Sequence, residues 1–219
     1  CGPAAVSVEL ARIVGPTGRV IGVEREDAAR TAARQVIAEA GVTNVELREG
    51  SATSTGIAPG TVDLAMMRHV LAHNGGSEQA IVDHLASLVR PGGAVYLVDV
   101  DLTGIRILDS DPDLDDLTER YAGFHAARGN DPTVGLRLSS LLTAAGLETV
   151  DFTGHYSIIE MPPGVRPPVW AARDTMVAEG AATPADVERW GAAFDRIDAS
   201  PVRPTAFAPV FIAIGRKGD

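Results

Sequence analysis

Residues 14–24 read VGPTGRVIGVE, and this stretch decides the fold class. A Gly-Pro-Thr-Gly turn precedes a short β-rich run at 19–24, which ends on the acidic residue Glu24. The alanine-rich stretch at 26–40 has no glycine or proline and stops at Gly41, which predicts a helix with a C-terminal glycine. A strand followed by a helix is half of a βαβ unit.

The same alternation continues to about residue 100. Apolar runs predict strands at 45–48, 62–67 and 94–100, and a helix at 77–89 separates the last two. Such runs suit strands that are covered on both faces, as in parallel sheets. We therefore expect an α/β fold with a doubly wound, mostly parallel sheet.

The second half of the chain changes character. Its patterns predict helices at 109–128, 136–145, 169–179 and 184–199, with strand-like stretches at 147–159 and 207–216. Thr183 is the expected N-cap of the last helix, and Pro184 its first residue. We expect the final strand to run antiparallel beside the strand that follows Gly146.

No linker separates two independent domains, so the prediction is a single domain over residues 1–219. Within it, residues 1–101 form the expected cofactor-binding half. Residues 102–219 supply acceptor-side helices, inserted over the acceptor site, and the C-terminal strands.

Composition excludes several classes of protein. The formal net charge is −10, so the chain as a whole lacks the basic face of a nucleic-acid binder. The one cysteine, Cys1, excludes a disulfide within the chain, and no apolar run is long enough for a membrane span. We expect a cytoplasmic protein whose partner is a small molecule, with neither nucleic acid nor a membrane span involved.

Two features predict a nucleoside site. Cys1-Gly2-Pro3-Ala4 precedes a helical stretch at 6–14, and a glycine turn that opens a helix lets backbone N–H groups approach a ligand. Glu24, at the tip of the next strand, can accept hydrogen bonds from ribose hydroxyls. By themselves, these features fit NAD as well as other nucleoside cofactors.

Four further motifs distinguish between these cofactors. They are REGSA at 48–52, Asp63 in the strand VDL, RHVLAH at 68–73 and LVRPGG at 88–93. In this order, and with the turn at 1–4 and the strand at 14–24, they resemble the class I S-adenosylmethionine-dependent methyltransferases. The resemblance is to the small-molecule group that includes the quinone-biosynthesis enzymes.

The resemblance covers about 1–101 well, 144–147 and the final strand loosely, and the intervening helices hardly at all. It implies S-adenosylmethionine as cofactor, bound by Cys1, Gly2, Pro3, Glu24, Gly50, Ser51, Ala52, Arg68 and His69. Gly2 and its neighbours would line the methionine part, and Glu24 would hold the ribose hydroxyls. Ser51 and Ala52 would lie beside the adenine, while Arg68 and His69 would face the substrate.

Two residues depart from the family pattern. Ala4 stands where a glycine is usual, so the loop is expected to be slightly displaced. Ser51 stands where an aspartate commonly accepts from the adenine amino group, so that contact should be weaker.

The family's first strand, at the centre of its sheet, has no counterpart in the sequence. Dropping a central parallel strand exposes two rows of backbone groups. We therefore interpret the sequence as an N-terminally truncated fragment of a longer protein, the alternative being that the numbered sequence omits residues. On this interpretation, residues 1–219 alone should be poorly stable and bind the cofactor weakly.

Methyl transfer needs alignment and exclusion of water, and a general base helps when the acceptor is a hydroxyl or phenol. His73, just after the fourth strand of the family pattern, and His125, on a helix face shared with Tyr121, are the candidate catalytic residues. His73 also has a purely structural alternative, in which it caps or orients its loop. No cluster has metal-ligand spacing, so we expect no metal. The acidic run at 109–116 is interpreted as a helix N-terminus with a solvated face.

The sequence therefore predicts methyl transfer from S-adenosylmethionine to a small, largely apolar molecule, at oxygen. Two alternatives stay open: a non-catalytic protein that binds the cofactor, and an NAD-dependent oxidoreductase. The RPGG turn and the RHVLAH segment speak against the oxidoreductase.

Overall fold

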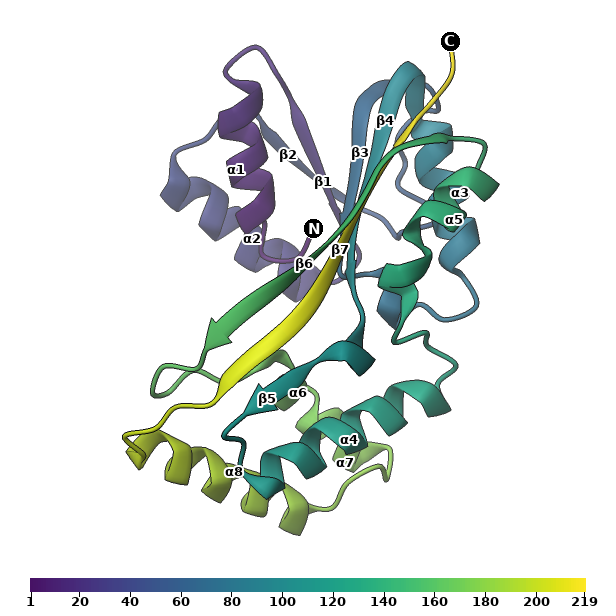
Figure 1. Cartoon of the computed structure of the whole chain (residues 1–219). Coiled ribbons are helices and arrows are strands. Elements are labelled where there is room, and N and C mark those ends of the chain that lie inside the picture. The colour runs from purple at the N-terminus through teal and green to yellow at the C-terminus, as the bar shows by residue number, and fades with distance from the viewer.

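In the computed structural model of the protein, which describes residues 1–219, the strands form two separate sheets. β1 (Val20–Glu24) and β2 (Val45–Glu49) pair in parallel and make the smaller sheet. The larger sheet has the order β3 (Val62–Arg68), β4 (Val89–Val100), β7 (Thr205–Arg216) and β5 (Arg106–Leu108), and β6 (Glu148–Glu160) also pairs with β7. Figure 1 shows β1 and β2 set apart from β3 and β4.

The strand directions match the sequence prediction. β3 and β4 are parallel, whereas β7 runs antiparallel to both β4 and β6. The expected single sheet is nevertheless interrupted, because β1 and β3 make no strand pairing with each other. These are the two strands between which the family resemblance places a further strand.

Helices cover the two sheets from opposite sides (Figure 1). α1 (Ala5–Val14) and α2 (Asp27–Ala40) contact β1 and β2. α3 (Glu78–Leu88) and α5 (Leu138–Ala144) pack on the larger sheet. This two-sided arrangement confirms the doubly wound α/β fold.

The main hydrophobic core lies between the larger sheet and α3 and α5. It includes Ile81 and Leu85 of α3, Leu142 of α5 and Leu97 of β4. Leu97 is paired in register with Ala213 of β7, so both side chains face the same side of the sheet. The antiparallel last strand therefore completes the core that begins in β3 and β4.

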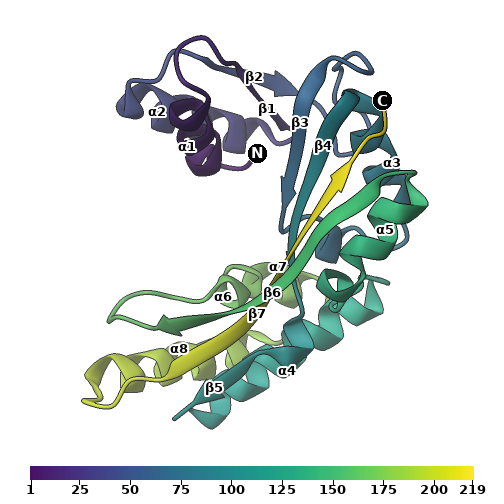
Figure 2. The ribbon, with the colours of Figure 1, turned by 45° about the horizontal axis from the view of Figure 1, so that its top comes forward.

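A second core holds a helical unit at the far end of β6 and β7 (Figure 2). The unit contains α4 (Pro112–Ala127), α6 (Pro168–Ala171), α7 (Arg173–Ala178) and α8 (Pro184–Ala199). Trp190, Phe194, Leu117 and Met176 are almost completely buried in it. None of the protein's helices has the length and apolar character needed to cross a membrane.

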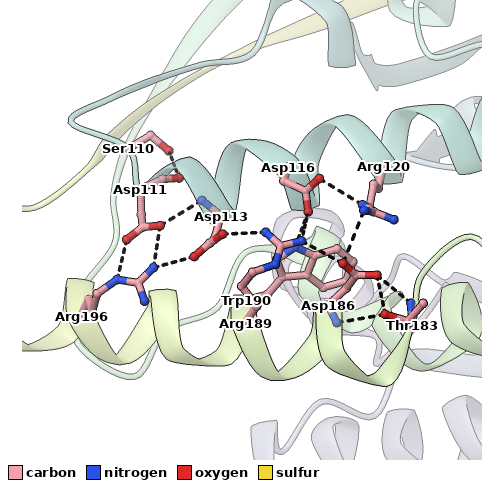
Figure 3. A network of polar contacts seen from close by, with 10 residues as sticks. All are labelled: Ser110, Asp111, Asp113, Asp116, Arg120, Thr183, Asp186, Arg189, Trp190 and Arg196. Carbon is pink, nitrogen blue, oxygen red and sulfur yellow. Dashed lines mark hydrogen bonds and ion pairs between the residues drawn. The ribbon is translucent and has the colours of Figure 1, made fainter.

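The acidic run at 109–116 has a different environment from the one predicted. Asp111 does cap α4, since its side chain accepts from the backbone N–H of Asp113. The run is not simply solvated, because arginines of α8 pair with it (Figure 3). Arg196 donates to Asp111 and Asp113, and Arg189 donates to Asp113 and Asp116. The charges therefore join two helices.

Several element boundaries differ from the prediction. α8 begins as expected, with Thr183 and Asp186 forming a reciprocal capping box. The helix predicted at 169–179 is instead two short helices, α6 and α7, separated at Ala172. The predicted Arg-Pro-Gly-Gly turn lies inside β4, which follows α3 directly. The register of β3 against β4 shifts at this end, between Val62 and Leu64. The short strand β5 was not predicted. Three short 3₁₀ segments complete the chain: η1 (Leu71–His73), η2 (Leu102–Gly104) and η3 (Val134–Arg137).

Candidate functional site

The N-terminal turn is tied to the tip of β1. The Gly2 N–H donates to Glu24 Oε2 at 2.8 Å, and the Cys1 nitrogen donates to the same oxygen at 3.1 Å and to the Val23 carbonyl at 2.6 Å. Gly2 and Ala4 both have a left-handed backbone, with φ of 54° and 62°. A non-glycine residue in this region is strained by on the order of 1 kcal/mol. Ala4 thus adopts, at some cost, a conformation that glycine adopts freely.

The Glu24 carboxylate is held ionised. Burial opposes its ionisation, but hydrogen bonds from the N–H groups of Glu26 and Gly2 outweigh burial and hold the pKa of Glu24 below its usual value of 4.5. Oε1 accepts from the N–H groups of Arg25 and Glu26. Nothing lies within 4 Å of the position that a Cβ atom would take on Gly2. A fixed anion beside an open glycine turn suits the hydroxyls of a ribose.

Arg30 holds this tip in place, a role that the sequence analysis did not predict. It is 9% exposed, and its guanidinium donates to the carbonyls of Glu24 and Arg25 and to the carboxylates of Asp27 and Glu49. It therefore joins the ends of β1 and β2 to the start of α2.

The predicted adenine loop follows β2. A Cβ atom on Gly50 would lie 2.8 Å from both the Ser54 carbonyl oxygen and a Val23 methyl, so only glycine fits there without a shift. Ser51 and Ser54 exchange backbone hydrogen bonds, which closes the loop into a tight turn around Ala52. Ser51 and Ala52 are both half-buried, and Ala52 packs against the edge of the main hydrophobic core.

The second group of predicted residues follows β3. Arg68 ends the strand with an exposed side chain, and His69 turns the chain with a left-handed φ of 54°. The Asp99 carboxylate, only 1% exposed, accepts from the N–H groups of Leu71 and Ala72. Asp99 is thus the anchor of η1, and the His69 Nδ1 lies 4.0 Å from its Oδ1.

The structure brings the two candidate catalytic histidines together. The ring centroids of His73, in η1, and His125, in α4, are 4.9 Å apart. Tyr121 packs edge-on against His125 at 4.3 Å, as its position four residues earlier predicts. Asn130 Nδ2 lies 2.8 Å from His125 Nδ1. Residues from the cofactor half and from the acceptor-side helices therefore meet here.

Both imidazoles favour the neutral form. Partial removal from water lowers the pKa of His73; Asp99 raises it and His69 lowers it. Burial also lowers the pKa of His125, and nearby His73 and Arg128 add to the effect. The pKa of Tyr121 is raised by burial. At neutral pH the pair can accept a proton and Tyr121 keeps its own.

The predicted site residues thus form two groups. Cys1, Gly2 and Glu24 are linked at the smaller sheet, whereas His69, His73 and His125 gather at the larger one. No hydrogen bond or ion pair joins one group to the other. Trp170 packs against Phe194, with ring centroids 5.0 Å apart, within the helical unit.

Comparison with known proteins places this geometry in a family. Residues 1–93 match the sequence profile of a family described as "Methyltransferase domain". Residues 1–93 therefore carry the sequence pattern of a methyltransferase domain. The resemblance to S-adenosylmethionine-dependent methyltransferases predicted from the sequence is thereby confirmed for residues 1–93, while the roles of individual residues stay predictions.

An arsenite methyltransferase of Halobacterium salinarum is 32% identical over 141 residues, which are 64% of this chain and 34% of that protein. An uncharacterised 37.1 kDa protein in transposon TN4556 of Streptomyces fradiae is 30% identical over 128 residues, 58% of this chain and 33% of that protein. The chain spans about a third of the length of these curated relatives.

Solved structures share the fold of the methyltransferase domain over the whole chain. A putative methyltransferase from Bacillus halodurans C-125 has a TM-score of 0.65 at 14% identity, covering 100% of this chain and 90% of that one. The cyclase SpnF has a TM-score of 0.59 at 18% identity, covering 100% of this chain and 72% of that one. The cyclase is named for a reaction other than methyl transfer, so the fold by itself does not determine the reaction.

Proposed function

We propose that the protein transfers a methyl group from S-adenosylmethionine to the oxygen of a small, largely apolar hydroxyl or phenol. The observation that carries the oxygen assignment is the neutral pair of His73 and His125, whose rings are 4.9 Å apart beside the loop that ends β3. An oxygen acceptor must lose a proton, and a neutral imidazole at neutral pH suits that task.

Cofactor binding is assigned to the smaller sheet. The cofactor supplies an activated methyl group on a sulfonium, and the protein needs only to bind, orient and shield it. The ionised Glu24 would accept from both ribose hydroxyls, and the turn at Gly2 leaves the space they need. The half-buried Ser51 and Ala52 would flank the adenine.

The acceptor is assigned to the junction of η1 and α4. Tyr121 and the two imidazoles supply flat, mostly apolar surfaces that suit an apolar molecule. The buried Asp99 fixes η1, so the proton acceptor is held rigidly relative to β4. Such fixed placement is what aligns an acceptor for in-line transfer.

The name of the Halobacterium relative raises arsenite as an acceptor. A soft centre such as arsenic(III) is bound best by thiolates. Residues 1–219 contain a single cysteine, Cys1, and it belongs to the cofactor turn rather than to the histidine pair. These residues offer no thiolate pair near the proposed acceptor position, which favours an oxygen acceptor.

Calorimetric titration of the full-length protein with S-adenosylhomocysteine tests the cofactor assignment. Glu24→Ala should weaken binding by about 10- to 150-fold, the scale of hydrogen bonds to a charged group. Glu26→Ala is the matched control, because that exposed carboxylate pairs only with Arg25 and should leave affinity unchanged. Equal affinities of wild type and Glu24→Ala would reject the role of Glu24.

Turnover with a panel of phenols, aliphatic alcohols, amines, thiols and arsenite tests the acceptor assignment. Formation of S-adenosylhomocysteine, measured by mass spectrometry, should be fastest with phenols or alcohols. Preferred methylation of an amine, a thiol or arsenite would contradict an oxygen acceptor. Tight cofactor binding without turnover of any acceptor would instead support the alternative of a non-catalytic cofactor-binding protein.

A further inference from the structure

Asn130 lies between the two halves of the proposed acceptor site. It follows α4 and Gly129, and its own backbone N–H donates to the His125 carbonyl at 3.1 Å. Its side-chain Oδ1 accepts from the Gly75 N–H at 3.0 Å, and its Nδ2 is 2.8 Å from His125 Nδ1. The side-chain amide of Asn130 therefore contacts both the loop after η1, at Gly75, and His125 of α4.

The contact with Gly75 is close and specific. A Cβ atom on Gly75 would overlap the carbonyl group of Gly129 and lie 2.6 Å from the Cα of Asn130. The backbone at Gly75 therefore packs directly against the backbone at Gly129 and Asn130, with no side chain between them. This close contact restricts the position of the Asn130 side-chain amide.

This position settles the orientation of the amide. The oxygen and nitrogen of an asparagine side chain are assigned from their partners. A backbone N–H such as that of Gly75 can only donate, so the Asn130 oxygen must face it. The Asn130 NH₂ group then faces His125 and donates, so Nδ1 of His125 must be the acceptor. A neutral His125 consequently carries its proton on Nε2.

The two histidines are therefore not equivalent. The only basic lone pair of His125 is already used by Asn130, so its other ring nitrogen, Nε2, can act only as an N–H donor. His73 makes no side-chain hydrogen bond within the protein, and its ring nitrogens remain available. Among charged and titratable neighbours, His125 faces Tyr121 and Arg128 of its own helix and His73 of η1. His73 faces Asp99 of β4 and His69.

We propose that Asn130 is a positioning residue that holds His125 as the Nε2–H tautomer, a hydrogen-bond donor to the acceptor oxygen, and so leaves proton removal to His73. The inference rests on the proposed function for the reaction, although the tautomer can be tested without turnover. In the reaction, the acceptor oxygen bonds to the methyl carbon and the carbon–sulfur bond breaks with its electron pair going to sulfur. The acceptor proton goes to a ring nitrogen of His73.

Nitrogen-15 NMR of the histidine rings in the full-length protein tests the tautomer. In the wild type, His125 should show an unprotonated Nδ1 and a protonated Nε2 at pH 7. Asn130→Asp presents only acceptors to Gly75 and His125, so His125 should gain a proton on Nδ1, with its pKa raised by about 1–3 units. Asn74→Asp adds the same charge nearby, at a side chain that bonds only to the Val70 carbonyl, and should leave His125 unchanged.

Kinetics test whether His125 is the donor and His73 the base. The amide NH₂ of glutamine can replace an Nε2–H donor, but it cannot act as a base. His125→Gln should keep kcat within about tenfold, the equivalent of one weakened hydrogen bond. His73→Gln should lower kcat by about 100-fold or more, the usual contribution of a general base. Both should bind S-adenosylhomocysteine as the wild type does.

A wild-type His125 protonated on Nδ1 alone, or an unchanged His125 in Asn130→Asp, would overturn the tautomer assignment. A greater loss of kcat in His125→Gln than in His73→Gln would overturn the assignment of His73 as base. If wild type methylates no acceptor, the proposed function fails, and the NMR result still decides the role of Asn130.

Discussion

Replacing Asp116 with alanine removes one carboxylate from the contact between α4 and α8 (Figure 3). Asp116 Oδ2 accepts from the indole N–H of Trp190 at 2.9 Å and from Arg189 at 2.7 Å, while Oδ1 accepts from Arg120 at 3.0 Å. Trp190 is fully buried, so its N–H loses its one protein partner once the carboxylate is gone.

The magnitude follows from these contacts. A buried donor without a partner costs about 1–3 kcal/mol. Each ion pair to a partly exposed arginine contributes about 0.2–1 kcal/mol, because solvent screens it. Asp116→Ala should therefore destabilise the fold by about 2–4 kcal/mol, or lower the Tm by about 5–15 °C for a chain of this length.

Thermal unfolding followed by circular dichroism measures the change. Asp116→Asn keeps an oxygen for the Trp190 N–H and loses the charge, so it should cost about half as much. Asp115→Ala removes the adjacent carboxylate, which is exposed and has no side-chain partner, and should cost no more than about 0.5 kcal/mol. If Asp116→Ala and Asp115→Ala melt at the same temperature, the buried hydrogen bond is not what holds α4 to α8.

Three further outcomes are expected. Gly75→Ala forces a methyl into the Gly129 carbonyl and should destabilise by about 1–3 kcal/mol, whereas Gly123→Ala, where nothing lies within 4 Å, should stabilise by about 0.4–1 kcal/mol; urea unfolding compares them. The pKa of Glu24 is lowered from 4.5 to about 2, so its contribution to stability is complete above pH 4.5 and lost as the pH falls to 2; Glu24→Gln should remove that part of an acid titration of Tm. Raising NaCl to about 1 M should lower the Tm of wild type more than that of Arg189→Ala, because salt screens the exposed ion pairs that Arg189 makes; equal shifts would mean that these pairs contribute nothing.

The elements that could be predicted from the sequence are those with a local cause. Apolar runs predicted β1 to β4, because a strand buried on both faces needs consecutive apolar residues. Gly41 predicted the end of α2, because glycine readily adopts the left-handed backbone of a C-cap. Thr183 and Pro184 likewise predicted the start of α8.

Other elements depend on partners far along the chain. β5 has only three residues and exists because it pairs with β7, about 100 residues later. The arginines of α8 that neutralise the acidic start of α4 are likewise distant, as in Arg196 and Asp111. No pattern among neighbouring residues in the sequence predicts such contacts.

The candidate site shows the same division. The two histidines were predicted individually, and the helical spacing of Tyr121 and His125 was visible in the sequence. Asn130 was missed, since its role depends on the backbone of Gly75 meeting it across 55 positions of sequence. Arg30 was missed because its four oxygen partners, on β1, β2, α2 and the turn between β1 and α2, come together only in the folded chain.

β6 and β7 pair antiparallel from Glu148 with Arg216 to Glu160 with Thr205, with one shift of register between Thr149 and Asp151. Everything between them in the sequence, α6, α7 and α8 included, is thus the connecting loop of one long β-hairpin. A residue inserted within β7 would turn Ala213 away from the main core, whereas one inserted between α7 and α8 leaves every strand pair in place. The helices α6, α7 and α8 can therefore change in length or sequence while every strand pair of the larger sheet stays as it is.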